Sequence, residues 1–417
     1  MTTTNKALDS KKNHYLWSFF LMIFFTIAMN NDWRDSYLLW YGSIALLFIS
    51  YCISFKAFYF KNTTYMKWLV SFIILGALSS IWSISTEVIS EVLNSLIVCL
   101  FVLTLLQSSI NYDFSIDIIF RNYFIATLVN AIYVVLNIDL SQLGQVQVGE
   151  MLLDGWNGNG IAFMAAHGVL IGSYLIKKSN NKIAKAFYLL SNVGLSFLCI
   201  YTGSRTAFIV LFSSVFFFLL ASRPSKLVRN ITISAIVISI VIYAVMNVEG
   251  FYRILGSRLE GLFSLFSGDG LVDSSAKLRS IYIENGKEWF AESPIVGHGI
   301  NNYKILNKAT TGRFTYAHNN FIEIAVDFGI IGLIWYYSIY VYLFFSLLKK
   351  VKNNIFNVFL LSAISVELIS HYGTVSYYDF YTNFLLMLCF YSANNEMTFK
   401  RNPNYERRNK SASVKMV

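Results

Sequence analysis

The chain has 417 residues, of which 56% are hydrophobic and only 13% are charged. Soluble domains carry about 25% charged residues, so the composition excludes a water-soluble enzyme, a disordered chain, a disulfide scaffold and a zinc-finger protein. It indicates a polytopic helical membrane protein. The net charge of +10 is then explained by cytoplasmic loops rich in Lys and Arg, and no nucleic-acid partner is expected.

Twelve apolar runs follow one another along the chain, each close to the roughly 20 residues that a membrane-spanning helix needs. The expected fold is therefore all-α, a polytopic transmembrane bundle of about 12 spans. The runs lie near residues 14–31, 37–55, 68–86, 90–109, 116–137, 158–176, 186–202, 205–222, 230–247, 323–348, 354–371 and 376–393.

The distribution of Lys and Arg predicts the orientation of these spans. An even number of spans places both ends of the chain on one side of the membrane. If that side is the cytoplasm, most of the loops on the cytoplasmic side carry clusters of Lys and Arg. The short outside loops hold only Arg34 and Arg205. Because basic loops stay in the cytoplasm, we expect both termini there.

Four segments are expected on this basis. Residues 1–247 hold spans one to nine, and residues 248–315 form one long outside loop. Residues 316–393 hold the last three spans, and residues 394–417 form a basic cytoplasmic tail. A loop as long as 248–315 is usually functional or disordered. Apolar residues at helical spacing within it predict an ordered, partly helical cover, and residues 138–157 form a second, shorter outside loop.

The first candidate site is the motif Gly203-Ser204-Arg205-Thr206-Ala207, in a very short outside turn between two spans. A cation at the membrane boundary is expensive. Arg205 either extends to lipid head groups or binds an anion together with Ser204, Thr206 and the free N–H groups of the next helix. We favour the anion site.

The second candidate follows within the long loop. Arg279 begins a predicted amphipathic helix that ends near Pro294, and Gly297 and Gly299 come directly after it. The two glycines allow a sharp turn or a close approach to a ligand. Alone, Arg279 could equally be a solvated charge.

The third candidate marks the return into the membrane. Asn320 followed by Glu323 is typical of a helix N-cap with a carboxylate three residues later, which places His318 and Asn319 just outside a helix N-terminus. The positive helix end and nearby arginines disfavour an imidazolium. A neutral imidazole is what a general base requires, although a structural role for His318 stays open.

Other ionisable residues lie within the spans. Glu323 and Asp327 share one helical face and could line an acceptor cavity or pair with an arginine. Glu367 and His371 also share a face near Asp379, but no third ligand is evident, so we expect no metal and no cofactor. His167 is interpreted as a packing residue.

Together these residues resemble a known family, the O-antigen ligase and polymerase superfamily of bacterial envelopes. The resemblance covers about residues 156–332 and rests on four motifs in order. These are Asn157-Gly158-Asn159, where Gly158 replaces a proline, then Gly203 to Ala207, then Arg279 with Trp289, Pro294 and Gly297-x-Gly299, and last His318-Asn319 followed by Gly329-x-x-Gly332.

The resemblance implies a fold similar to that of the GT-C glycosyltransferases and a bacterial inner-membrane enzyme that acts on the periplasmic side. The implied donor is a glycan on undecaprenyl diphosphate, and the implied catalytic residues are Arg205, Arg279 and His318. We expect substrate contacts from the residues around them, namely Asn159, Ser204, Thr206, Gly297, Gly299, Asn319, Asn320 and Glu323. The other expected partners are a glycan acceptor, membrane lipid and a chain-length regulator.

The motifs do not separate related activities. A polymerase transfers the growing glycan to the next lipid-linked repeat unit, and the Asn-, Lys-, Ile- and Phe-rich composition favours it. A ligase transfers finished glycan to lipid A–core, and a protein O-oligosaccharyltransferase transfers it to protein. A flippase or other transporter is the rival from another class, but transporters usually have internal repeats and broken helices.

Overall fold

The computed structural model describes residues 3–55, 63–137, 158–222, 227–257, 259–260, 274–352 and 354–394, and these residues form helices and loops without strands. The predicted all-helical bundle is confirmed. The predicted outside loop 138–157 and nearly all of the predicted basic tail lie outside the described residues.

Each predicted span coincides with a helix. These helices are α1 (Thr3–Met29), α3 (Tyr37–Ser54), α4 (Thr64–Leu78), α5 (Ile89–Asn111), α6 (Ile116–Asn137), α7 (Gly158–Lys178), α8 (Lys182–Tyr201), α9 (Arg205–Ser222), α10 (Leu227–Asn247), α15 (Asn320–Leu348), α16 (Ile355–Ser370) and α17 (Phe380–Ala393). Within the described residues, seven helices are long and apolar enough to cross a membrane, and α9, α16, α17 and the part of α1 from His14 to Met29 are shorter apolar helices.

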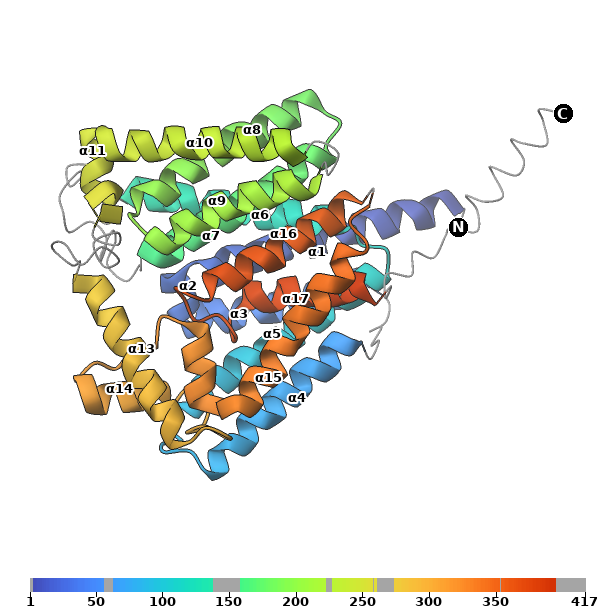
Figure 1. Ribbon diagram of the computed structural model, residues 1–417. Helices are drawn as coiled ribbons and strands as arrows, with labels where there is room; N and C mark the ends of the chain where they lie inside the picture. The colour runs from blue at the N-terminus through green and yellow to red at the C-terminus, as the bar shows by residue number, and fades with distance from the viewer. Residues whose placement is uncertain are drawn as a thin grey trace.

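The remaining helices of the described residues lie at one end of the bundle. They are α2 (Asn31–Asp35), η1 (Ser79–Ile81), α11 (Glu249–Phe251), η4 (Tyr252–Gly256), α13 (Ser274–Glu292) and α14 (Tyr303–Thr311). In Figure 1 the start of α1 and the end of α17 lie together on the right, whereas α2, α11, α13 and α14 lie on the left. This arrangement agrees with an even number of crossings.

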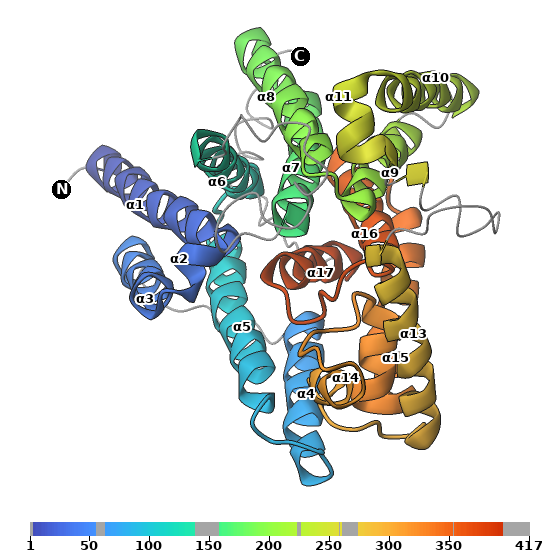
Figure 2. The ribbon, with the colours of Figure 1, turned by 90° about the vertical axis from the view of Figure 1, so that its left-hand side faces the viewer.

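Helix α17 lies near the centre of the bundle, between α8–α10 on one side and α4 and α15 on the other (Figure 2). Every residue from Tyr381 to Ser392 is buried, as expected for a helix that is surrounded on all sides. The predicted start at residue 376 was four residues early because the Asp379 side chain caps the helix, accepting hydrogen bonds from the N–H groups of Tyr381 and Thr382.

Helix α15 is broken at Gly329, which has φ 63° and ψ −158°. The span predicted over 323–348 lies within this helix, but the sequence pattern gave no sign of the break. The segment after α13 pairs with the break: His298 N–H donates to the Val326 carbonyl at 2.8 Å, and Ile330 N–H donates to the Pro294 carbonyl at 2.8 Å. Irregular backbone near a bilayer is tolerated only where protein satisfies its polar groups, and this segment does so.

Two glycines allow this contact between backbones. Both Gly297 (φ +69°) and Gly329 (φ +63°) adopt the left-handed conformation, which side chains other than hydrogen disfavour. A Cβ on Gly297 would lie 2.5 Å from the Asp327 carbonyl carbon, and one on Gly329 would lie 2.7 Å from the Val296 nitrogen. The glycines of two motifs thus face each other across one junction.

The described part of the long loop packs over one end of the bundle. The Asp327 carboxylate, at the end of the first segment of α15, accepts hydrogen bonds from the N–H groups of Asn301 (2.8 Å) and Tyr303 (3.0 Å) at the start of α14. Lys304 pairs with Glu91 of α5 at 3.0 Å. These contacts hold α14 against the spans.

Candidate functional site

The first arginine motif forms the turn between α8 and α9. Gly203 has φ +67°, and Arg205 is the first residue of α9, with only 8% of its surface exposed. The Ser204 hydroxyl donates to the Asn159 side-chain oxygen at 2.7 Å, so the turn also contacts the first turn of α7. Three helix ends therefore meet at this arginine.

Arg279 reaches the same place from the long loop. It lies in the second turn of α13, the amphipathic helix predicted to end near Pro294, which ends at Glu292. Its Nη1 donates to the Thr206 hydroxyl at 3.4 Å, a contact between residues 73 positions apart. The two arginine motifs are thus neighbours in space.

His318 completes the cluster. Its ring centroid lies 4.2 Å from that of Tyr316, and it is parallel to the Tyr282 ring at 6.3 Å. Tyr282 is three residues after Arg279 on α13, hence on the same face. Burial and the neighbouring Arg279 charge lower the pKa of His318 from 6.5 to about 3. The imidazole is neutral at ordinary pH, as the sequence predicted.

The backbone at His318 is strained. Its φ of 53° is uncommon for any residue other than glycine, and strained residues persist where their surroundings over-determine them. Here the next residue caps α15: the Asn319 side chain accepts hydrogen bonds from the N–H groups of Phe321 and Ile322. The cap holds the histidine just outside the helix.

The predicted cap at Asn320 was wrong by one position. Asn320 is the first helical residue, and it is fully buried. Its side-chain oxygen accepts hydrogen bonds from the N–H groups of Ser376 and Tyr377. Asn320 therefore anchors the loop between α16 and α17, which a sequence pattern within one helix cannot reveal.

The two carboxylates of α15 contact backbone groups. Glu323 is fully buried, and its Oε2 accepts the Ala317 N–H at 2.6 Å. Asp327 accepts N–H groups from the start of α14 and the Tyr377 hydroxyl at 3.1 Å. These contacts order the segments on either side of His318 and do not pair either carboxylate with an arginine.

Gly297 and Gly299 lie apart from the cluster. They follow the far end of α13, about 20 Å along that helix from Arg279 at 1.5 Å per residue. Gly297 packs on the break in α15, and a Cβ on Gly299 would lie 2.7 Å from the Ser83 side chain. Both glycines are buried against other parts of the protein, whereas Thr206, Arg279 and His318 are half-buried.

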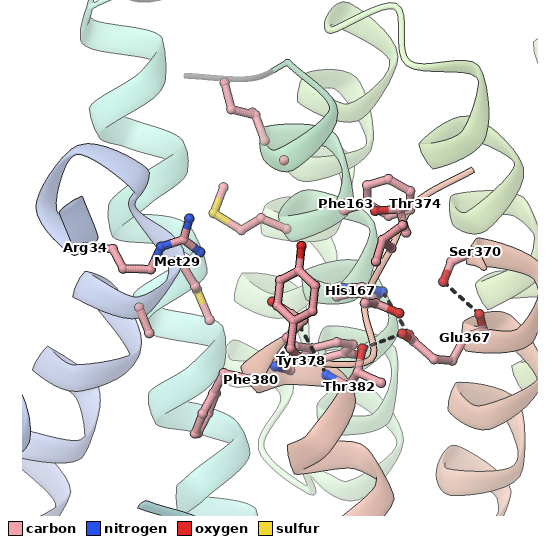
Figure 3. A pocket seen from close by; sticks show the side chains of 18 of the residues that line it. Met29, Arg34, Phe163, His167, Glu367, Ser370, Thr374, Tyr378, Phe380 and Thr382 are labelled. Atoms are coloured by element: carbon pink, nitrogen blue, oxygen red, sulfur yellow. Dashed lines mark hydrogen bonds and ion pairs between the residues drawn. The ribbon is translucent and has the colours of Figure 1, made fainter. Parts of the chain in front are cut away.

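A cavity of about 280 Å³ adjoins the cluster. In Figure 3 Met29 and Arg34 lie on one side of it, and His167 and Glu367 lie on the other. His167 Nε2 lies 3.8 Å from the Glu367 carboxylate, and the His167 ring stacks on Tyr381 at 3.9 Å. The sequence interpretation of His167 as a packing residue missed this pair. The signal was present, because an ionisable residue within a span is a functional candidate by default.

The comparisons with known proteins fit this geometry. Residues 190–337 match a family model described as O-antigen ligase, and this range contains Arg205, Arg279 and His318. No curated protein matches the chain significantly. The apolar helices indicate an integral membrane protein, and its residues 190–337 are similar to the O-antigen ligase family.

Proposed function

We propose that this protein polymerises a bacterial surface polysaccharide at the periplasmic face of the inner membrane. It takes the growing glycan from undecaprenyl diphosphate and transfers it to the next lipid-linked repeat unit. The observation that carries this proposal is the position of Arg279, which contacts Thr206 beside Arg205 and also lies near enough to His318 to lower its pKa.

The two guanidinium groups suit a lipid diphosphate. Guanidinium groups bind phosphate oxygens through paired N–H donors, and the bonds are strong where little water competes. Arg205 and Arg279 would bind the diphosphate and stabilise the charge that develops on it as the glycosidic bond breaks. Two fixed cations can supply this stabilisation without a metal ion.

His318 acts on the acceptor in this proposal. The acceptor hydroxyl oxygen attacks the anomeric carbon as the bond from that carbon to the phosphate oxygen breaks, and the hydroxyl proton passes to the imidazole. Attack opposite the leaving group inverts the anomeric centre. A pKa of about 3 makes a weak base, but a bound diphosphate offsets the Arg279 charge and so raises the pKa of His318 toward the operating pH.

A ligase is the second candidate, and the description of the matching family model, O-antigen ligase, favours it. The donor half of the reaction is the same, and only the acceptor changes to lipid A–core. The polymerase proposed above would also work with a partner protein that sets the length of the glycan chain.

Deletion of the gene, followed by display of the surface glycan on a gel, tests these alternatives. Lipid A–core capped with a single repeat unit supports the polymerase. Bare core with polymer retained on undecaprenyl diphosphate supports the ligase, and unchanged glycan with altered glycoprotein supports a protein-directed enzyme. If neither the surface glycan nor the glycoprotein changes, the result contradicts glycan transfer by this protein.

Complementation of the deletion strain then tests the site. Arg205→Ala, Arg279→Ala and His318→Ala should each fail to restore the glycan while reaching the membrane at normal levels. Lys287→Ala is the control on α13. Lys287 is exposed and pairs with the neighbouring exposed Glu284, a contact of little energetic value. Near-normal glycan from all three site variants contradicts the proposal.

A further inference from the structure

The cavity in Figure 3 contains an unusual set of polar atoms. Four lining residues have a buried side-chain atom without a hydrogen-bond partner among the described residues: His167 Nε2, Glu367 Oε2, Ser376 Oγ and Tyr381 Oη. Each of these residues is at least nine-tenths buried, with exposed fractions of 9%, 3%, 6% and 7%. They come from α7, α16, α17 and the loop before α17.

Buried polar atoms are nearly always hydrogen-bonded, so four such atoms around one cavity indicate a ligand that supplies both donors and acceptors. His167 Nε2 and Glu367 Oε2 are 3.8 Å apart, too far for a direct hydrogen bond. A hydroxyl oxygen about 2.8 Å from each could bridge them at ordinary hydrogen-bond lengths. The hydroxyl groups of Ser376 and Tyr381 can each donate or accept.

The charges of the cavity disfavour a phosphate at this position. Glu367 and Asp379 both line the cavity, and the lining cation Arg34 lies on the side away from Glu367 (Figure 3). A carboxylate repels an anion placed beside it. The remaining wall includes Phe163, Tyr378 and Phe380. A few directed polar groups on an aromatic wall suit a neutral ligand with many hydroxyl groups and apolar faces. A sugar ring has these properties.

The cavity borders the arginine and histidine cluster. Tyr316 lines the cavity, and its ring contacts that of His318. Gly373, one residue before the cavity-lining Thr374, packs so closely on Thr206 that a Cβ on Gly373 would overlap the Thr206 side chain. A ligand group in the cavity is therefore beside the atoms that we assign to the reaction.

A second cavity, of about 900 Å³, lies next to the first and is lined in part by α3 and α5. The two share Arg34, Tyr378, Asp379 and Phe380 as lining residues. A glycan longer than one sugar could extend from the first cavity into the second.

We propose that the cavity between His167, Glu367, Ser376 and Tyr381 is a sugar-binding subsite that positions one ring of the glycan beside the diphosphate. This inference rests on the proposed glycan transfer. The ring belongs either to the donor, next to its diphosphate, or to the end of the acceptor, since both present the same hydroxyl chemistry.

Tyr381→Phe and Ser376→Ala test the subsite, because each removes only a hydroxyl group that has no hydrogen-bond partner in the described part of the chain. Tyr391→Phe and Ser392→Ala are matched controls at the other end of α17, where the hydroxyl groups donate to Asn111 at 2.8 Å and Asn357 at 2.6 Å. The full chain is purified in lipid nanodiscs. The probes are glycan-bearing undecaprenyl diphosphate, extracted from the deletion strain, and undecaprenyl diphosphate without glycan.

Native mass spectrometry measures how strongly each variant retains the two lipids. The wild type should prefer the glycan-bearing lipid, and the double variant Tyr381→Phe/Ser376→Ala should lose about tenfold or more of that preference while still binding the bare lipid. Its melting temperature without glycolipid should stay equal or rise, whereas the control variants should melt earlier and keep the preference. A merely structural role for the two hydroxyl groups would lower the melting temperature of the double variant.

Transfer kinetics then separate the two sources of the ring. A raised KM for the donor lipid with an unchanged KM for the acceptor assigns the subsite to the donor sugar, and the reverse assigns it to the acceptor. A wild type without preference for the glycan-bearing lipid, or a double variant that keeps it, overturns the subsite. If the wild type transfers glycan and the double variant binds the glycan-bearing lipid normally, the subsite alone is refuted. If the wild type transfers no glycan, the proposed function is refuted.

Discussion

Arg279 offers the sharpest test of the cluster, because it links the other two elements. Its contact with Thr206 is 3.4 Å long, beyond the usual 2.7–3.2 Å, so this hydrogen bond alone contributes little. Thr206→Val should therefore lower kcat/KM for glycan transfer by no more than about fivefold, equivalent to about 1 kcal/mol. The charge of Arg279 matters more than its contact with the threonine.

Arg279→Ala removes one of two cations that face the proposed diphosphate. Loss of one preorganised donor to developing charge costs about 10²–10³ in rate, or about 2.7–4 kcal/mol, and we expect a loss in this range. Arg279→Lys keeps the charge but lacks the planar fork of donors, so a loss of roughly tenfold is expected. The three variants should thus rank Thr206→Val, Arg279→Lys and Arg279→Ala in order of increasing damage.

The assay measures transfer by purified full-length protein supplied with lipid-linked glycan from the deletion strain. Each variant is first shown to have a wild-type melting temperature, so that lost activity reflects chemistry. Lys287→Ala on the exposed face of α13 is the control. If Arg279→Ala retains more than about a tenth of the wild-type kcat/KM, or if Thr206→Val is the more damaging change, the reasoning about the Arg279 charge is refuted.

Three further predictions concern pH and stability. Because the pKa of His318 is lowered to about 3, its imidazole stays neutral in the free enzyme above that pH, so kcat/KM should show no His318 titration between about pH 5 and pH 7; an acid limb near pH 6.5 would contradict this. Gly329→Ala should lower the free energy of unfolding by about 1–3 kcal/mol in thermal unfolding, through its left-handed φ and contact with Val296. Gly42→Ala, with open space around it, is its control, and equal melting temperatures would count against the junction. Asp327→Asn weakens two charge-assisted hydrogen bonds to the start of α14, worth about 1.5–3 kcal/mol each, so limited proteolysis should cut the loop around α14 faster than in the wild type, and an unchanged rate would contradict the anchoring role.

The apolar helices were predictable because the hydrophobicity of a segment depends only on the residues within it. The segment predicted as 116–137 is α6, Ile116–Asn137, and the segment predicted as 205–222 is α9, Arg205–Ser222. The break in α15 was not predictable from its hydrophobicity, because Gly329 is stabilised in its conformation by carbonyl and N–H groups about 30 residues earlier in the chain.

The candidate residues divide in the same way. Arg205 stood out because a cation in a short outside turn is rare, and His318 because a polar motif precedes an apolar helix. The pairing of His167 with Glu367 was missed because it joins α7 to α16, helices far apart in sequence. The cap at Asn319 rather than Asn320 also depended on a distant segment, since Asn320 is used by the loop before α17.

The amino-acid order alone determined that this is a many-span helical membrane protein with polar motifs at the ends of its spans, since burial in lipid and charge at its boundary are properties of single segments. Tertiary structure decided which motifs meet: α13 carries Arg279 to the α8–α9 turn and to His318, and side chains of α1, α2, α6, α7, α16 and α17 line the cavity beside them. The physical reason is that a site made from separate helix ends depends on how those helices pack, and packing arises from contacts that no single segment encodes.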